Sequence, residues 1–479
     1  MKKDFHAFLK KKRKTAKYRP VYERIKDYKD VVAPRSDEES QEQALRCMDC
    51  GTPFCHWGCP VANLIPEWNE FVSAGHWYEA FNLLDSTNVL PEVTGRICPA
   101  LCESACVLGV TDEPVTVREN ELAIIERAFK ERYVKPRIPK KRSGKKIGVI
   151  GSGPAGISTA VHLNRLGHNV TVFEKDERIG GFLRFGIPDF KLEKNILDRR
   201  LDIFEKEGVE FKTNINIGKD LPVSDILKEF DIICITIGCR VPRDLKVPGR
   251  ELKGIHFAAD YLTQVNRINS GAILKEQEIS ASNKKVIIIG GGDTGSDCIG
   301  TANRQGAVSV KQIEIMPQMP EFRAEDMPWP YHPLLLRTSS SHKEGAERHW
   351  SVLTKEIIGE NGHVKKLICD KVEFSQEKDS GDRPGIKKIQ GTEFEIEADL
   401  VILAMGFTQP DGTGIIKELG LKVDDRGNIQ TNDNYRTSNE KVFSAGDARR
   451  GASLIVWALY EGYMAAKNID IQLNSKKEE

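Results

Sequence analysis

Apolar and polar residues follow two different patterns along this chain. In residues 1–143, apolar side chains recur every three or four positions, as in "LIPEWNEFVSAGHWYEAFNLL" and "ENELAIIERAF", and this spacing predicts amphipathic helices. From Lys146 onward, short runs rich in β-branched residues alternate with helical segments, which is the pattern of parallel α/β units. We therefore predict an α/β protein with a helical N-terminal domain, joined to the rest by the basic linker "VKPRIPKKRSGKK".

The α/β region contains one long repetition. The segment "KKIGVIGSGPAGISTAVHLNRLGHNVTVFEK" recurs as "KKVIIIGGGDTGSDCIGTANRQGAVSVKQIEIMP", and each copy places a G-x-G-x-x-G loop between a strand and a helix. Such glycines permit a tight turn, let a pyrophosphate approach the backbone and let helix and strand pack closely, while an acidic residue after the next strand binds a ribose. Two dinucleotide sites are therefore expected. The candidate residues are Gly151, Gly153, Pro154, Ala155, Gly156, Glu174 and Lys175 in the first copy and Gly290, Gly292, Asp293, Thr294, Gly295 and Glu314 in the second.

Shorter glycine-containing segments surround the two copies. "ERIGGFLRFGIPDFKL" follows the first copy, "DIICITIGC" and "DLVILAMGF" bracket the second, and "VFSAGDARRGASLIVWAL" lies near the C-terminus. This order resembles the two-dinucleotide flavoprotein reductases, and the resemblance implies two Rossmann-like domains, an FAD domain (144–250 and 398–479) interrupted by an NAD(P) domain (251–397). It also implies that Asp447 contacts the ribityl and phosphate part of FAD. The further FAD candidates are Gly181, Arg184, Gly238, Gly446, Asp447 and Ser453.

Composition excludes several classes of partner. The 479 residues suffice for roughly three domains, and 71 basic against 70 acidic residues give a net charge of +1, so no global field attracts nucleic acid or an anionic membrane. Every apolar run is far shorter than the ~20 residues that a membrane span needs. The basic start, "MKKDFHAFLKKKRKTAKYRP", has no apolar segment or cleavage pattern of a signal peptide, so we expect an exposed arm on a cytoplasmic protein.

Seven of the 11 cysteines lie in "CMDCGTPFCHWGCP" and "CPALCESAC". The other four, Cys234, Cys239, Cys298 and Cys369, stand singly in apolar segments and are interpreted as packing residues. Three interpretations of the seven compete: structural zinc, whose paired spacing fits poorly; a thioredoxin-like C-x-x-C; and iron-sulfur clusters. The last is favoured, because a close run of cysteines ending in Cys-Pro is a ferredoxin pattern.

These parts together predict an electron-transfer enzyme. A reduced nicotinamide delivers two electrons to a flavin as hydride, a flavin can release them singly, and iron-sulfur centres carry single electrons. The segment "GGFLRFGIP" lacks the cysteine pair of the disulfide reductases, so the cysteine-rich region is the visible acceptor. The chain is therefore expected to convert two-electron into one-electron transfer.

Almost the whole sequence resembles the small (beta) subunits of glutamate synthases, a family related to part of dihydropyrimidine dehydrogenase. The resemblance rests on "RPVYERIKDYKD", "ALRCMDCGTPFCHWGCPVANLIPEWN", "GRICPALCESACVLG", "MPWP", "RTSSSH" and "GDARRGASLIVWAL". It implies that NAD(P)H reduces FAD and that electrons pass through two 4Fe-4S clusters to a large (alpha) subunit, which makes glutamate from glutamine and 2-oxoglutarate. This chain itself begins Met1-Lys2-Lys3, without the N-terminal nucleophilic cysteine of such an amidotransferase.

Two other functions stay open at this stage. A related reductase subunit would feed a dihydropyrimidine dehydrogenase partner or a ferredoxin, whereas an assembly module would use its clusters only to stiffen a docking surface. For the coenzyme, the family favours NADPH, but Glu314 favours NADH because a carboxylate repels a 2'-phosphate. The nearest following arginine, Arg323, would have to return through a loop. No catalytic residue is assigned.

The same resemblance implies a division of the cysteines. One cluster would be held by Cys47, Cys50, Cys55 and Cys106, and the other by Cys59, Cys98, Cys102 and a non-cysteine ligand, Glu121, at a position where a glutamine serves in dihydropyrimidine dehydrogenases. The alternative is that Glu121 lies in the solvated first turn of a helix, where an acidic residue is favourable.

Overall fold

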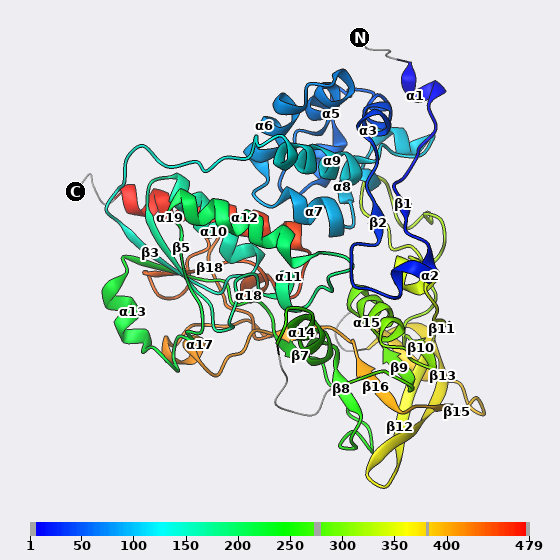
Figure 1. Cartoon of the computed structure of the whole chain (residues 1–479). Helices are drawn as coiled ribbons and strands as arrows, with labels where there is room; N and C mark the ends of the chain where they lie inside the picture. Colours follow the sequence, from blue (N-terminus) through cyan, green and yellow to red (C-terminus); the bar gives the residue numbers. More distant parts are fainter. Residues whose placement is uncertain (1–5, 273–278, 380–382, 476–479) are drawn as a thin grey trace.

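The computed structural model describes residues 6–272, 279–379 and 383–475. A helical N-terminal domain lies against two α/β units, here called the first half and the second half after their order in the chain (Figure 1). Across the described ranges, no helix has both the length and the apolar character needed to cross a membrane.

The N-terminal domain is a group of short helices around an apolar core. Trp68, Ile124 and Ile125 are almost fully buried in this core. Cys55 lies in α4 (Phe54–Gly58) and Cys102 in α8 (Leu101–Ser104), and the other cysteines of the two segments lie in the loops that flank these helices. The helices are α1 (Ala7–Lys10), α2 (Val21–Arg24), α3 (Asp37–Ala44), α4 (Phe54–Gly58), α5 (Ile65–Ala74), α6 (Trp77–Thr87), α7 (Pro91–Ile97), α8 (Leu101–Ser104), a 3-10 turn (Val107–Val110) and α9 (Val117–Lys130).

The first half is a parallel five-stranded sheet covered by helices. Its strand order is β18-β6-β3-β4-β5, so β18, the last strand of the chain, completes the sheet by pairing in parallel with β6. The strands are β3 (Lys146–Ile150), β4 (Asn169–Phe173), β5 (Glu210–Lys212), β6 (Ile232–Ile235) and β18 (Val442–Ser444). The helices are α10 (Pro154–Arg165), α11 (Phe182–Phe185), α12 (Lys194–Glu207), α13 (Val223–Glu229), α17 (Ile415–Glu418), α18 (Asp447–Arg450) and α19 (Ile455–Ser475).

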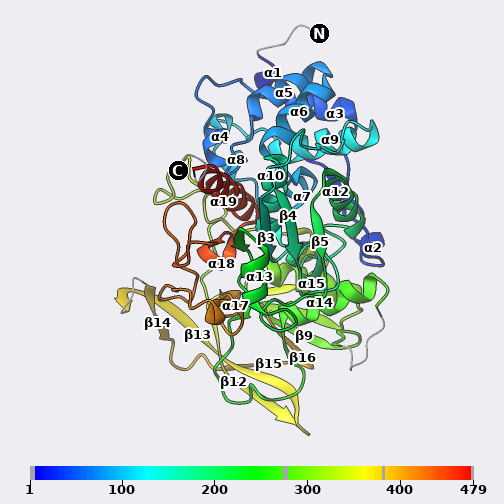
Figure 2. The same ribbon diagram turned by 90° about the vertical axis from the view of Figure 1, so that its left-hand side faces the viewer.

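The second half repeats this plan with strand order β11-β10-β9-β16-β8. Its strands are β8 (Ile255–Phe257), β9 (Lys285–Ile289), β10 (Ser309–Ile313), β11 (Glu347–His349) and β16 (Leu400–Leu403), and its helices are α14 (Ala258–Asn269), α15 (Asp293–Arg304) and α16 (Ser340–Lys343). An antiparallel extension comprises β12 (Val352–Glu360), β13 (His363–Asp379), β14 (Arg383–Lys388) and β15 (Phe394–Glu397). Figure 2 shows this extension projecting from the rest of the molecule.

The two halves are joined by a short antiparallel pair, β7 (Val241–Pro242) with β17 (Phe407–Gln409). Since β16 pairs in parallel with β8 and β9, it belongs to the second half. The boundary predicted after residue 397 therefore falls inside the second half and is corrected to the β7–β17 pair. The error has a physical reason: "DLVILAMG" reads as a buried strand ending in glycine, and such a strand fits either sheet.

Most described residues of the predicted arm, 6–20, are exposed, but the segment that follows attaches it to the second half. Residues 13–35, here called the strap, contain the small pair β1 (Lys17–Tyr18) and β2 (Val32–Ala33) and run from the helical domain to the second half (Figure 1). Arg24 Nε lies 2.6 Å from Glu344 Oε1, and Arg304 Nη1 lies 2.6 Å from Glu344 Oε2. All three side chains are at most 4% exposed, so a buried ion-pair network fastens the strap.

Candidate functional site

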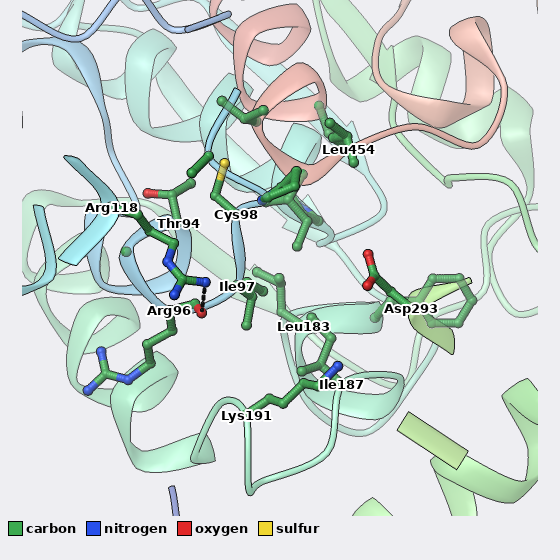
Figure 3. Close-up of a pocket in the computed structure, with 18 of the residues that line it drawn as sticks. Thr94, Arg96, Ile97, Cys98, Arg118, Leu183, Ile187, Lys191, Asp293 and Leu454 are labelled. Carbon is green, nitrogen blue, oxygen red and sulfur yellow. Dashed lines mark hydrogen bonds between the residues drawn. The ribbon is translucent and has the colours of Figure 1, made fainter. Parts of the chain in front are cut away.

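A cavity of about 1600 Å³ lies where the helical domain and both halves meet. This volume exceeds the ~300–1,000 Å³ of an ordinary small-molecule pocket, as expected of a site for more than one large cofactor. Figure 3 shows Cys98 of the helical domain, Leu183 and Lys191 of the first half, Asp293 of the second half and Leu454 around the same space.

The first fingerprint forms a cradle at one wall of this cavity. Gly151 has a φ of 101°, a conformation that disfavours side chains, and an added β-carbon there would lie 2.6 Å from the Thr236 carbonyl oxygen. At Gly156 an added β-carbon would lie 1.9 Å from the Gly151 carbonyl oxygen. Gly153 differs, because its added β-carbon would meet no protein atom within 4 Å. The first and third glycines thus serve the fold, and the second keeps open the space at the start of α10.

The second fingerprint repeats this geometry in the second half. Gly290 has a φ of 123°, and its added β-carbon would lie 2.3 Å from the Ala404 carbonyl oxygen. At Gly295 the nearest atom would be the Gly290 carbonyl oxygen at 2.5 Å, while Gly292 again faces open space. Gly153 and Gly292 are the N-cap residues of α10 and α15. At neither helix start does an N-cap side chain accept a hydrogen bond from a backbone amide. The free amides at both helix starts therefore suit a phosphate group.

Two carboxylates border the first cradle. Glu174 follows β4, is 3% exposed, and accepts hydrogen bonds from the Ser152 amide at 3.1 Å and from the Asp176 amide at 2.9 Å. Asp447 accepts a hydrogen bond from Ser453 Oγ at 2.7 Å. Burial raises the pKa of Asp447 to about 6, and the hydrogen bonds from Ser453 oppose this shift. Both carboxylates line the cavity at positions suited to the hydroxyl groups of a dinucleotide.

The predicted dinucleotide residues fall into two groups. Those that line the cavity are Gly151, Gly153, Pro154, Ala155, Glu174, Lys175, Gly181, Gly238, Asp293, Thr294, Asp447 and Ser453. Arg184 is not among them, because its guanidinium donates to the Ile179 carbonyl oxygen at 2.6 Å and pairs with Asp198. The other predicted residues outside the cavity lining are Gly156, Gly290, Gly292, Gly295, Glu314 and Gly446. A role of Arg184 in cofactor binding stays a prediction.

The first set of cysteines surrounds a small apolar pocket of its own. Cys47, Cys50, Cys55 and Cys106 all line this pocket, together with residues such as Phe54. Burial raises the pKa of Cys47 to about 12, and the nearby Cys106 and Cys50 thiols raise it further. The pKa of Cys55 is raised by burial and by Cys47, Cys106 and Cys50. These four thiols are therefore close neighbours, although Cys106 comes from a distant part of the sequence.

The second set comprises Cys59, Cys98 and Cys102, of which Cys98 lines the large cavity. Burial, followed by the Glu121 carboxylate and Cys98, raises the pKa of Cys59 to about 12. Burial and the same carboxylate raise the pKa of Cys98 to about 11. The pKa of Cys102 is raised by burial, Cys59, Cys98 and Glu121. Three thiols and one carboxylate thus share one environment, and a metal bound there would have to displace their protons.

Glu121 is buried and oriented by the protein. It lies on α9, is 5% exposed, and accepts hydrogen bonds at Oε1 from Thr94 Oγ1 at 2.5 Å and from Asn88 Nδ2 at 3.0 Å. Among the residues described, no hydrogen bond to Oε2 is found. Burial raises the pKa of Glu121 to about 7 despite these hydrogen bonds. The alternative position in a solvated helix turn is therefore wrong, and the carboxylate faces the cysteines instead.

The backbone of both cysteine segments turns sharply beside the thiols. Asp49, between Cys47 and Cys50, has a φ of 53°, and Ala100, between Cys98 and Cys102, has a φ of 60°. Non-glycine residues adopt this conformation rarely and at a cost, so it points to a functional constraint. In the described part of the chain, no group of three or more histidine, cysteine, aspartate or glutamate side chains is placed to hold a metal ion.

Two features of the site escaped the sequence analysis. Lys191 and Asp297 form an ion pair and line the cavity, and although both lie in quoted segments, neither was assigned as a site residue. Arg323 is not returned toward Glu314, because its guanidinium donates to the carbonyl oxygens of Met327 and Tyr331, each at 2.9 Å. A sequence alone could not reveal these partners, since each is distant along the chain or placed by an irregular loop.

Two family models match the chain. Residues 145–462 match the model described as pyridine nucleotide-disulphide oxidoreductase, and residues 24–133 match the model described as dihydropyrimidine dehydrogenase domain II, 4Fe-4S cluster. Together they cover the two α/β halves and the cysteine-containing helical domain. The predicted order of an iron-sulfur domain followed by Rossmann-type units is thereby confirmed.

Individual relatives extend over nearly the whole chain. The glutamate synthase [NADPH] small chain of Mycobacterium tuberculosis is 48% identical, covering 96% of this chain and 93% of that protein. The glutamate synthase [NADH] of Schizosaccharomyces pombe is 42% identical over 98% of this chain but only 23% of its own length. Among solved structures, FprA from M. tuberculosis in complex with NADPH has a TM-score of 0.56 at 18% identity, covering 70% of this chain and 86% of that chain, which supports the fold of the two halves.

Proposed function

Because this chain belongs to the family of glutamate synthase small chains, we propose that it passes electrons from NADPH through FAD and two 4Fe-4S clusters to a large glutamate synthase subunit. The chain is a flavoprotein oxidoreductase that binds FAD and NAD(P)H and carries a 4Fe-4S cluster. A cytoplasmic location is part of the proposal, since free thiols and iron-sulfur clusters suit a reducing compartment.

The observation that carries the proposal is that Cys98 lines the same cavity as the first fingerprint (Figure 3). FAD would be held by the cradle at Gly153, by Glu174 and by Asp447, and it would exchange hydride with NADPH and single electrons with a cluster. The second set reaches this cavity through Cys98, whereas the first set lines a separate pocket. We therefore propose the order coenzyme, FAD, second set, first set, external acceptor.

The residues of this chain bind and orient the reactants. The free amides at the start of α10 would hold the pyrophosphate of one dinucleotide, and those at the start of α15 would hold the pyrophosphate of the other. The cavity has apolar walls at Leu183, Ile187 and Leu454, and these side chains help to exclude water. Such a dry, preformed site strengthens the electrostatic contacts that its polar groups make with bound cofactors.

The nature of the acceptor is supported by one relative. In the S. pombe glutamate synthase, the matching segment is part of a much longer chain. A separate small chain of this family would therefore need the remaining part as a second subunit. We propose that this large subunit makes glutamate from glutamine and 2-oxoglutarate with the electrons that it receives.

The proposed function is tested with the purified chain alone and with the large subunit. The chain should contain one FAD, should be reduced by NADPH, and should pass electrons to an artificial dye. Glutamate should form from glutamine and 2-oxoglutarate only after the large subunit is added. A preparation that contains only FMN, or a flavin band that NADPH does not bleach, would refute the proposal.

The choice of coenzyme gives a separate prediction at Glu314. This side chain follows β10, and its Oε1 accepts a hydrogen bond from the Met316 amide at 3.1 Å. It also lies under the second cradle, because a β-carbon added at Gly291 would be 2.2 Å from Glu314 Oε2. A carboxylate so close to the expected ribose disfavours a 2'-phosphate. Glu314→Ala should therefore raise the ratio of kcat/KM for NADPH to that for NADH by roughly tenfold, or ~1.4 kcal/mol.

The measurement is a steady-state comparison of both coenzymes with the same dye. Glu347→Ala is the matched control, because this exposed carboxylate lies on neighbouring β11 and pairs with Lys311 at 2.9 Å. An unchanged ratio in Glu314→Ala would show that this carboxylate does not face the ribose of the coenzyme.

A further inference from the structure

A lysine–aspartate ion pair joins the two halves at the edge of the cavity. Lys191 lies in the loop between α11 and α12 of the first half, and Asp297 lies on α15 of the second half. Lys191 Nζ contacts Asp297 Oδ1, and the two side chains are 20% and 10% exposed. Both residues line the cavity, and Figure 3 shows Lys191 and Asp293 at the same end of it.

The loop that carries Lys191 is held on two sides. From within, Lys194 Nζ donates hydrogen bonds to the carbonyl oxygens of Ile187 at 2.6 Å and Leu192 at 2.9 Å. From the strap, the Val31 amide donates to the Phe190 carbonyl oxygen at 3.1 Å. The ammonium group of Lys191 is therefore fixed in place before any ligand binds, which is the condition for a strong electrostatic effect.

The charge of Lys191 is maintained by its surroundings. Burial lowers its pKa, but the Asp297 carboxylate more than compensates, and the net shift of the Lys191 pKa is upward. Asp293 and Tyr18 act in the same direction. A buried ion pair contributes little to stability compared with apolar residues of similar size, so stability alone does not account for a charged pair at this position.

The pair lies where the two expected dinucleotides converge. The first cradle, Glu174 and Asp447 line the same cavity as Leu183 and Ile187, so FAD held by the cradle would extend into this shared space. The coenzyme would enter from the start of α15, and Asp297 lies one helical turn after Asp293 on that helix. Lys191 thus borders the space in which the flavin and nicotinamide rings would meet.

We propose that the Lys191–Asp297 pair sets the reduction potential of the bound FAD. The fixed ammonium favours the additional negative charge of reduced flavin, and the carboxylate moderates this effect. Because the carboxylate comes from the second half, the potential depends on the docking of the two halves. This inference rests on the proposed function, since it requires FAD in the cavity.

The test compares the FAD midpoint potential of the holoenzyme and its variants, measured by reductive titration against a reference dye. Lys191→Met leaves a carboxylate without its cation and should lower the potential. Asp297→Asn leaves an ammonium without its anion and should raise it. Lys191→Arg keeps the positive charge, so its FAD midpoint potential should stay close to that of the unmodified protein. Lys285→Met is the matched control, because its ion pair with Glu397 on the second half is exposed.

Opposite shifts in Lys191→Met and Asp297→Asn would support the proposal, because simple structural damage would move both variants in the same direction. Shifts of one sign, equal potentials in all variants, or loss of FAD from every charge-changing variant would overturn it and make the pair a packing contact. If the unmodified chain itself binds no FAD, the proposed function fails, and the two failures are thereby distinguished.

Discussion

Gly153→Ala is expected to remove most FAD from the protein while leaving the fold of the cofactor-free chain intact. The backbone at Gly153 has φ −67° and ψ −176°, which any residue can adopt, and no protein atom lies within 4 Å of the added β-carbon. The cost to the fold should therefore be about 1 kcal/mol or less. A pyrophosphate seated on the α10 amides would meet the new methyl group, and binding should weaken at least tenfold, or ~1.4 kcal/mol.

The second fingerprint supplies the matched control. Gly292→Ala changes an equivalent open position in the second half, so it should weaken binding of the coenzyme and leave FAD bound. Gly156→Ala is the structural contrast, since its β-carbon would lie 1.9 Å from the Gly151 carbonyl oxygen and should destabilise the fold itself. FAD content by absorbance and melting temperature of the cofactor-free chain separate these outcomes. Full FAD occupancy in Gly153→Ala would refute the assigned cradle.

Glu121→Ala should lower the iron content by up to half and leave FAD bound. The reason is that three cysteines and this carboxylate form one environment, while four cysteines form another. Without the carboxylate, one iron of the second cluster would lack a protein ligand. The reduced protein should also show a changed low-temperature EPR spectrum, because a carboxylate is a harder donor than a thiolate and influences the potential of its cluster.

Two further variants sharpen this test. Glu121→Gln keeps the shape and one carbonyl oxygen, so it should retain more iron than Glu121→Ala. Glu131→Ala is the control on the same helical segment, because that side chain forms an exposed pair with Arg127 at 3.3 Å. Unchanged iron and an unchanged spectrum in Glu121→Ala would remove Glu121 from the ligand set.

Local patterns predicted the fold and much of the site. Each fingerprint places its glycines, strand and helix within a short segment, so the pattern could be recognised from neighbouring residues. The carbonyl oxygens that exclude a side chain at Gly151 and Gly290 belong to Thr236 and Ala404, and these could not be identified from the sequence. The cysteine segments could likewise be recognised from spacing, whereas the closeness of Cys106 to Cys47 was expected from resemblance only.

The features that sequence analysis missed all depend on distant partners. Arg184 looked like a cofactor residue because it lies in a glycine-rich loop, but Asp198 on α12 draws its guanidinium away. Lys191 finds Asp297 only when the two halves dock. Arg24 of the strap likewise pairs with Glu344, which belongs to the second half. In each case the charged residue could be seen in the sequence, but the residue that pairs with it could not be identified.

The strap also has a consequence for biosynthesis. Arg24 is made early, whereas Glu344 lies 320 residues further along the chain. At ~5–20 residues per second, roughly 15 to 60 seconds separate their synthesis. For the later part of this interval the helical domain has been synthesised, but the second half cannot yet close against the strap. The Arg24–Glu344 ion pair therefore forms only after most of the chain has been made, so docking of the strap is a late step in the folding of the protein.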